Sequence, residues 1–282
     1  MQSSPFSSVQ AARESLGARL RDLRLDAGLT MQQLADRCAW SKSKVSRIEA
    51  ARTAPSDADI RHWCRASEVE DQAADLIAAS RSADSMYVEW RRMERTGMRR
   101  LQESAVPLYE RTKLFRVYAS RVVPGLLQTE GYAGALLAQI AEFRNVPDDS
   151  SQAAAVRVDR SHVIRSGQCQ VSLLIEEDVL FYQFGDVSTM AGQLGYLLTA
   201  LSYPAVAIGV IPRTAPRTMW GQETFTMFDD TRVHVELLNA KVTITTPGEV
   251  DMYRRAFGKL GEMAVYGQPA RALITHAIDS LG

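Results

Sequence analysis

The chain has 282 residues, about twice the length of a typical domain, which predicts two domains that can each bury a core. Hydrophobic residues make up 46% and charged residues 23%, ordinary values for a soluble globular protein that argue against disorder beyond the ends. The formal net charge is zero but unevenly spread: residues 1–80 hold 11 basic and 11 acidic residues, residues 81–121 hold 10 and 5, and residues 122–282 hold 12 and 17.

Other whole-chain features exclude several classes of protein. The three cysteines are too scattered for a disulfide framework or a close-paired zinc site, so a reducing cytoplasm fits best. Residues 1–12 lack the basic start and apolar core of a secretory signal and are expected to be a flexible tail. The uncharged run from Val187 to Arg213 contains polar residues and changes period, so we expect a buried helix followed by a buried strand rather than a membrane span.

Residues 13–80 have the pattern of five short helices. The first runs from about Arg13 to Ala27 and ends at Gly28. Thr30, followed three positions later by Gln33, forms a capping box for a second helix. A third helix follows closely, capped by Ser41. The pattern is therefore a helix, a tight turn and a helix.

Two further helices complete this predicted all-α domain. Pro55 and Ser56 precede a fourth helix, and a fifth is expected at about Glu70 to Ala79. The stretch from Ser82 to Glu103 is charged and has no strand pattern, so we expect a connecting helix at residues 81–105. Its arginines are expected to pair with nearby glutamates on a solvated face, with contact to flanking DNA as the alternative. They are Arg91, Arg92, Arg95, Arg99 and Arg100.

The rest of the chain, residues 106–282, predicts an α+β domain. Strand-like runs occur at residues 170–175, 206–211, 224–228, 232–238 and 241–245. Helices are expected at about residues 130–143, 152–165, 188–202, 249–265 and 270–280.

The third helix, SKSKVSRIEA, has two chemically different faces. At about 100° per residue, Val45 and Ile48 point to one side. Lys42, Ser43 and Arg47, with Ser46, point to the other side, and long cations separated by small hydroxyls suit the major groove of DNA. A solvated basic face is the ordinary alternative for an isolated helix.

The surroundings favour the DNA-binding interpretation. The segment RLRDLRLDAGLTMQQLADRCAWSKSKVSRIEAARTAP resembles the DNA-binding domain of the xenobiotic-response-element class of helix-turn-helix regulators. That resemblance implies an ion pair between Arg24 and Glu49, so Glu49 is not a base contact. It also implies that the protein binds double-stranded DNA. In that arrangement Gln32 and Arg52 contact backbone phosphates, and the remaining predicted DNA-binding residues lie on the recognition helix. The predicted DNA-binding residues are Gln32, Ser41, Lys42, Ser43, Lys44, Ser46, Arg47 and Arg52.

Two positions depart from this family pattern. Met31 stands where glutamine is usual, which removes one polar anchor. Ala51 stands where glycine is usual, and a left-handed turn there is expected to cost about 1 kcal/mol.

A second resemblance covers the C-terminal part. VPGLLQTEGYA, from Val123 to Ala133, and then QLGYLL, VAIGVIP and VHVEL resemble actinobacterial regulators that join this DNA-binding domain to an antitoxin-like domain of unknown function. The resemblance implies a cytoplasmic, dimeric transcriptional regulator, often encoded beside a small partner protein. From the residues alone, Pro124 and Gly125 form a turn and Thr129 caps a helix, which favours a structural joint over a ligand site.

Other candidate sites are weaker. The four histidines show no metal-binding spacing, so no metal or cofactor is expected. The acidic run from Glu176 to Asp178 is expected to be a solvated turn, and Glu236 a buried residue in an ion pair. Four aromatic residues are expected in a plain core, with a small-molecule pocket as the alternative: Tyr182, Phe184, Trp220 and Phe225.

Three functions remain open, and none is enzymatic because the sequence lacks a nucleophile motif and a phosphate-binding loop. The first is a homodimeric regulator that binds an inverted-repeat operator. The second is an antitoxin-like interaction module controlled by a small partner protein. The third is a regulator whose C-terminal domain senses a small molecule.

Overall fold

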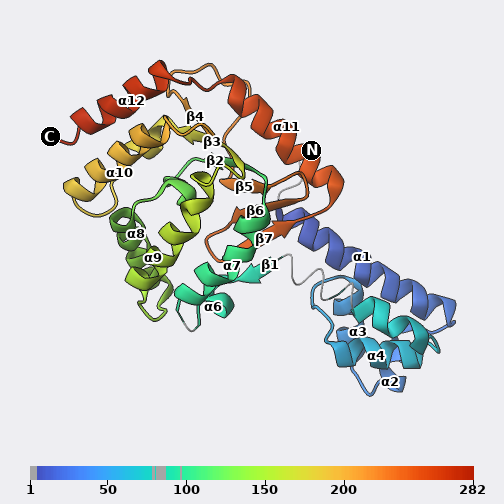
Figure 1. Cartoon of the computed structure of the whole chain (residues 1–282). Helices are drawn as coiled ribbons and strands as arrows, with labels where there is room; N and C mark the ends of the chain where they lie inside the picture. The colour runs from blue at the N-terminus through green and yellow to red at the C-terminus, as the bar shows by residue number, and fades with distance from the viewer. Residues whose placement is uncertain (1–4, 78–79, 81–86, 96) are drawn as a thin grey trace. The chain divides into compact units, whose positions relative to one another are not determined.

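The structure is a computed structural model of the chain, and it describes residues 5–77, 80, 87–95 and 97–282 (Figure 1). The chain divides into two compact units, Met1–Val88 and Glu89–Gly282. The predicted fold class is confirmed: the first unit carries the helices and the second combines helices with a mixed sheet.

The N-terminal unit is built from short helices around one core. Its elements are α1 (Pro5–Asp26), α2 (Met31–Arg37), α3 (Lys42–Glu49), α4 (Asp57–Ala66), the 3-10 turn η1 (Glu70–Gln72) and a last helical stretch at residues 73–77. Leu20, Leu34, Ile48 and Trp63 bring one fully buried side chain from each of the helices α1 to α4. The Trp63 indole nitrogen donates to the Leu20 carbonyl at 2.9 Å, so its polar atom is satisfied inside this core.

Two predicted boundaries are wrong. Helix α1 begins at Pro5, so residues 5–12 are helical rather than a flexible tail. Residues 81–105 do not form one connecting helix: β1 (Tyr87–Glu89), α6 (Trp90–Met93) and α7 (Arg99–Arg111) occupy the described part of this segment. β1 has only three residues, too short a run to stand out in the charged segment, and its pairing at the edge of the sheet is a tertiary contact that local sequence does not reveal.

The C-terminal unit centres on a sheet of order β1-β7-β6-β5-β2-β3-β4. Strands β2, β3 and β4 are parallel, whereas β2, β5, β6 and β7 pair antiparallel. The strands are β2 (Leu114–Ala119), β3 (Gln170–Glu176), β4 (Val206–Ile211), β5 (Phe225–Phe228), β6 (Arg232–Glu236) and β7 (Ala240–Ile244). The five predicted strands are present as β3 to β7, but β2 was not predicted although it lies between β5 and β3.

Helices connect and cover these strands. They are α8 (Glu130–Arg144), α9 (Ser150–Arg160), α10 (Val187–Ala200), α11 (Pro247–Glu262) and α12 (Gln268–Asp279), with 3-10 turns η2 (Gly125–Leu127), η3 (Ser161–Ile164) and η4 (Glu177–Leu180). The run after Val187 is α10 followed by β4, as predicted, and no helix in the described residues is long and apolar enough to cross a bilayer.

Strand alternation decides which helix meets which face of the sheet. Phe115 and Phe228 lie on one face, where both rings contact Tyr109 of α7. Phe225 points to the opposite face and contacts Tyr253 of α11. Because side chains alternate along a strand, the sheet lies between α7 and α11 (Figure 1).

Helix α7 is held in place from a distant part of the chain. The Asp149 carboxylate accepts from the backbone nitrogen atoms of Met98 at 2.7 Å and Arg99 at 2.9 Å. These are free amides at the start of α7, and a carboxylate is a favourable partner for them. The cap fixes α7 against the start of α9.

Candidate nucleic-acid interface

The turn between α2 and α3 is set by two side-chain caps. Thr30 Oγ1 accepts from the Gln33 backbone nitrogen at 3.2 Å, and Gln33 Oε1 accepts from the Thr30 nitrogen at 2.8 Å, which completes the predicted capping box. Ser41 Oγ accepts from the Lys44 backbone nitrogen at 3.3 Å and caps α3. Ala39 has a φ of 56°, a left-handed conformation that reverses the chain between the helices.

Helix α3 separates its side chains as its periodicity requires. Val45 and Ile48 are buried in the core of the N-terminal unit. The opposite face exposes Lys42, Ser43, Ser46 and Arg47. Among the described residues, neither Lys42 nor Arg47 takes part in an ion pair, so their charges face solvent uncompensated.

Arg24 and Glu49 hold this helix to α1. Arg24 Nε lies 2.6 Å from Glu49 Oε1 and Nη2 lies 3.1 Å from Oε2, a bidentate pair. Arg24 Nη1 also donates to the Leu29 carbonyl at 2.6 Å. The side chains are 5% and 4% exposed, so Glu49 is part of the fold and does not lie on the outer face.

The end of α3 is tightly constrained. Ala51 has a φ of 53°, so this alanine adopts the left-handed turn at the position where glycine is usual. On α1, a Cβ at Gly17 would lie 2.8 Å from the Glu49 carbonyl oxygen, which only glycine avoids. The interpretation of the sequence missed Gly17, although a glycine inside a helical pattern is the signal of such a close approach.

Lys44, one of the predicted DNA contacts, is engaged within the protein. Its Nζ lies 2.6 Å from Asp59 Oδ1 and 4.0 Å from the centre of the Trp40 ring. Burial acts to raise the pKa of Asp59, but hydrogen bonds from Lys44 and Ser56 outweigh it, so the pKa lies below its ordinary value. Lys44 therefore joins α3 to α4, and its charge is largely neutralised by Asp59.

The remaining predicted contacts divide into free and engaged groups. Arg52 is exposed and takes part in no ion pair among the described residues. Ser41 Oγ lies 2.9 Å from Ser43 Oγ in addition to capping α3. The Gln32 amide donates to Asp36 Oδ1 at 2.8 Å, and binding of a phosphate there requires this bond to break. Met31 packs against the core, which explains how an apolar residue is accommodated at this position.

Other candidates find structural surroundings. Thr129 caps α8 by accepting from the Tyr132 nitrogen at 3.4 Å. Phe184 contacts Tyr132 whereas Phe225 contacts Tyr118, so the structure does not gather the four predicted aromatic residues in one place.

The acidic and basic candidates differ from expectation. Glu176 is not a solvated turn residue, because Arg217 binds it bidentately at 2.8 and 2.9 Å. Glu236 is exposed rather than buried, since it is the last residue of β6. Arg99 pairs with Glu103 at 2.8 Å, and the side chains of Arg91 and Arg92 lie outside the described residues. Within the described part of the chain, no group of three or more potential ligands is arranged to hold a metal ion.

Comparisons with solved structures and curated proteins contribute little. The archaeal chromatin protein TrmBL2, whose structure is described as showing a novel mode of DNA binding, is 11% identical to this chain. The match covers 75% of this chain and 69% of TrmBL2 with a TM-score of 0.32, which is too low to bear on fold or function. No curated protein matches the sequence.

Family models are informative. Residues 15–77 match a family described as a helix-turn-helix domain. Residues 102–276, more than half of the chain, match a family described as a domain of unknown function, DUF5753. The chain therefore belongs to the DUF5753 family and carries a helix-turn-helix domain ahead of the segment that defines this membership.

Proposed function

We propose that this protein is a sequence-specific transcriptional regulator that binds DNA through α3. The supporting observation is the outer face of α3, where Lys42, Ser43, Ser46 and Arg47 are exposed while Val45 and Ile48 are buried behind them. Arginine can bind guanine bidentately, lysine can reach a base or phosphate, and the small serines let the helix enter a major groove.

In this proposal the protein acts as a homodimer. Two recognition helices about 34 Å apart would read the two halves of an inverted repeat in successive major grooves. The helix-turn-helix family match supports the DNA-binding part, whereas the dimer rests on the resemblance of the sequence. Control of the C-terminal unit by a small partner protein stays a prediction.

The test begins with genome-wide mapping of the DNA bound by the full chain, followed by affinity measurements on the recovered sequence. Replacing Arg47 with Ala is expected to weaken operator binding by about 1–3 kcal/mol and to relax the preference at one base pair. Arg65→Ala is a control of equal charge loss, because Arg65 is exposed on α4 rather than α3. Equal effects of the two variants on sequence preference would contradict the assignment of α3.

Mapping with and without a co-expressed neighbouring small protein examines the partner hypothesis in the same experiment. A changed set of bound sites is expected if the partner acts through the C-terminal unit. An unchanged set would contradict this form of control without affecting the proposal for α3.

A further inference from the structure

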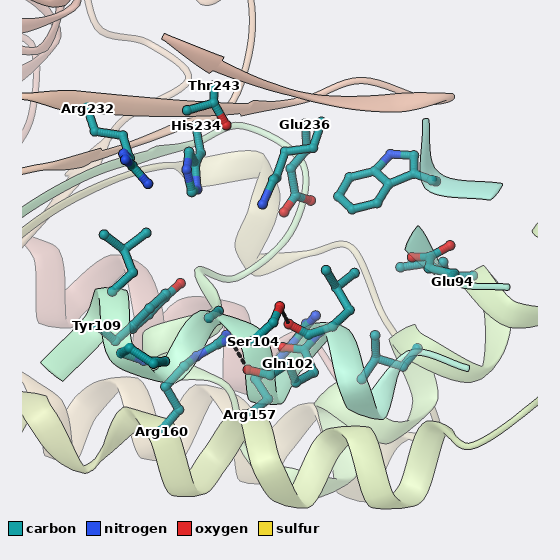
Figure 2. A pocket seen from close by; sticks show the side chains of 18 of the residues that line it. Glu94, Gln102, Ser104, Tyr109, Arg157, Arg160, Arg232, His234, Glu236 and Thr243 are labelled. Carbon is teal, nitrogen blue, oxygen red and sulfur yellow. Dashed lines mark hydrogen bonds between the residues drawn. The ribbon is translucent and has the colours of Figure 1, made fainter. Parts of the chain in front are cut away.

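The C-terminal unit contains a cavity of about 340 Å³ that is partly open to solvent. Residues of β6 and β7 form one wall, and residues of α7 and α9 form the other (Figure 2). Its volume lies within the range of about 300–1,000 Å³ that is usual for small-molecule sites. The cavity lies wholly within the C-terminal unit and shares no residue with the proposed DNA-binding face.

Strand periodicity explains why polar side chains line the sheet wall. Arg232, His234 and Glu236 alternate with buried valines along β6, so all three project from the same face. The register places Thr243 opposite His234 and Lys241 opposite Glu236, which brings the β7 side chains to that face as well. Figure 2 shows Arg232 and His234 directed from the strands toward the helices.

Helix periodicity builds the opposite wall. Arg157 and Arg160 are three residues apart on α9, so their side chains lie on neighbouring positions of one helix face. Figure 2 shows both arginines extending from α9 toward the sheet. Two cations thus converge from the helix wall on a sheet wall that already carries Arg232 and Lys241.

The charges around the cavity do not balance. The six cations of the lining face only two carboxylates, Glu94 and Glu236, an excess of four positive charges. The cations are Arg111, Arg144, Arg157, Arg160, Arg232 and Lys241. Glu94 is already engaged by Arg144 at 2.6 Å, so it does not neutralise the others.

Arg160 is the clearest case of an unsatisfied polar group in the cavity lining. It is 7% exposed, its Nη1 donates to the Gln102 carbonyl at 3.3 Å, and its guanidinium lies over the Tyr109 ring at 4.1 Å. Its buried Nε has no hydrogen-bond partner. A buried guanidinium without a carboxylate is unfavourable, because neutral acceptors replace only part of the lost hydration.

Arg157 is in a similar position. It donates to Gln102 Oε1 at 3.2 Å and Gln128 Oε1 at 2.8 Å, which are both uncharged acceptors. Burial, and then the charge of Arg160, lower the pKa of Arg157. The two arginines therefore repel each other without an anion between them.

The sheet wall experiences the same positive field. Burial, followed by the charges of Lys241 and Arg232, lowers the pKa of His234 to about 3. Burial also lowers the pKa of Lys241, with Glu236 acting in the opposite direction and Arg232 and Arg160 adding to the decrease. Lys241 on β7 is thus influenced by charged groups on both β6 and α9.

We propose that this cavity binds a small organic anion with phosphate or carboxylate groups, held between Arg157 and Arg160 on α9 and Arg232 and Lys241 on the sheet. Planar guanidinium groups match the oxygen pairs of both kinds of anion. An anion with two or more negative charges compensates the excess of positive charge and gives the Arg160 Nε an acceptor. This ligand site goes beyond the proposed DNA binding and does not depend on it.

The test uses the full chain without DNA. Pyrophosphate and citrate are titrated as separate probes by calorimetry and thermal unfolding, against sodium chloride of equal ionic strength. A saturable rise in Tm with at least one probe is expected, because a ligand that binds only the folded state stabilises it. Binding of pyrophosphate alone identifies a phosphate ligand, and binding of citrate alone identifies a carboxylate ligand.

Variants locate the site. Arg160→Met is expected to weaken binding at least tenfold without lowering the Tm of the free protein, because it removes an unpaired buried charge and keeps apolar volume. Lys241→Met tests the opposite wall and keeps the proposal testable if the first variant does not fold. Arg271→Met, at an exposed position of α12, is the control and is expected to bind as the unmodified chain does.

Three results would overturn the proposal. One is the absence of a shift with either probe. Another is equal binding by the Arg160 and Arg271 variants. The third is binding of a hexaglutamate peptide in the absence of binding of either small anion, which would assign the cavity to an acidic partner protein.

Discussion

Arg24 of α1 and Glu49 of α3 form a bidentate ion pair at 2.6 and 3.1 Å in the interior of the N-terminal unit. Arg24 also donates to the Leu29 carbonyl just before α2, so one guanidinium connects the first helix to both helices of the helix-turn-helix. The orientation of α3 depends on this pair. The side of α3 that is held against α1 determines which side of the helix faces outward.

Replacing Glu49 with Ala is expected to destabilise the N-terminal unit by about 3–5 kcal/mol, since it leaves Arg24 as an uncompensated buried charge. Hydrogen exchange of α1 and α3 peptides in the full chain measures this loss locally. Glu262→Ala, which removes a surface pair with Lys259 at 2.9 Å in α11, is the control, and exchange of α11 peptides is expected to show a cost of about 0–1 kcal/mol. A comparable loss in both variants would contradict the structural role of Glu49.

Ala51→Gly is expected to stabilise the N-terminal unit by about 0.5–1 kcal/mol. Relief of the left-handed strain contributes about 1–2 kcal/mol, and the greater freedom of glycine in the unfolded chain offsets part of it. The same substitution at the exposed Ala18, inside α1, is expected to destabilise by about 1 kcal/mol. Hydrogen exchange measures the change in stability caused by each substitution, and the two changes are expected to have opposite signs.

Lys42 and Lys44 are expected to affect DNA binding differently although they are two residues apart on α3. Lys42→Ala removes an uncompensated exposed cation and is expected to reduce the slope of log affinity against log salt by about 1. Lys44→Ala breaks the 2.6 Å pair with Asp59. It is therefore expected to act mainly on stability and to change the salt slope less than Lys42→Ala does. Fluorescence anisotropy over a salt series, with thermal unfolding, measures both; identical salt slopes for the two variants would contradict the assignment.

His234 predicts a pH dependence of stability. Its folded pKa of about 3 lies below its ordinary value of 6.5, so below pH 6.5 the unfolded chain binds a proton that the folded chain does not. The contribution of His234 is therefore complete above pH 6.5 and is lost as the pH falls toward 3. Urea unfolding between pH 7 and 4.5 measures the difference.

His234→Gln is expected to lose less stability over that interval and to take up about one proton fewer on unfolding. The matched control is the same substitution at His162, which is exposed and does not line the cavity. An unchanged pH profile in His234→Gln would show that this histidine titrates freely in the folded chain.

Local sequence patterns were sufficient to predict the structure of a segment wherever that segment carries its own signal. The capping box at Thr30 and Gln33 and the two faces of α3 follow from residues within a single short segment, whereas the left-handed turn at Ala51 was expected from the resemblance to known regulators. The resemblance to known regulators then paired Arg24 with Glu49, residues that no local pattern connects. Five strands were likewise evident from β-branched or alternating runs.

Long-range contacts decided the rest. β2 was missed because its strand state depends on neighbours more than 50 residues away, β3 and β5, and β1 is a strand because it lies beside β7. Lys44 was assigned to DNA from its helix position, but Asp59 on another helix accepts its charge. A side chain's surroundings thus changed its role without any change in its local pattern.

The sequence by itself determined the helix-turn-helix and the exposed basic face of α3, since helix periodicity and capping are local properties. The cavity of the C-terminal unit was decided by tertiary structure alone. Its arginines on α9 and its cations on β6 and β7 are ordinary surface-like residues in the sequence, and only the packing of helix against sheet places them together without enough carboxylates to balance them.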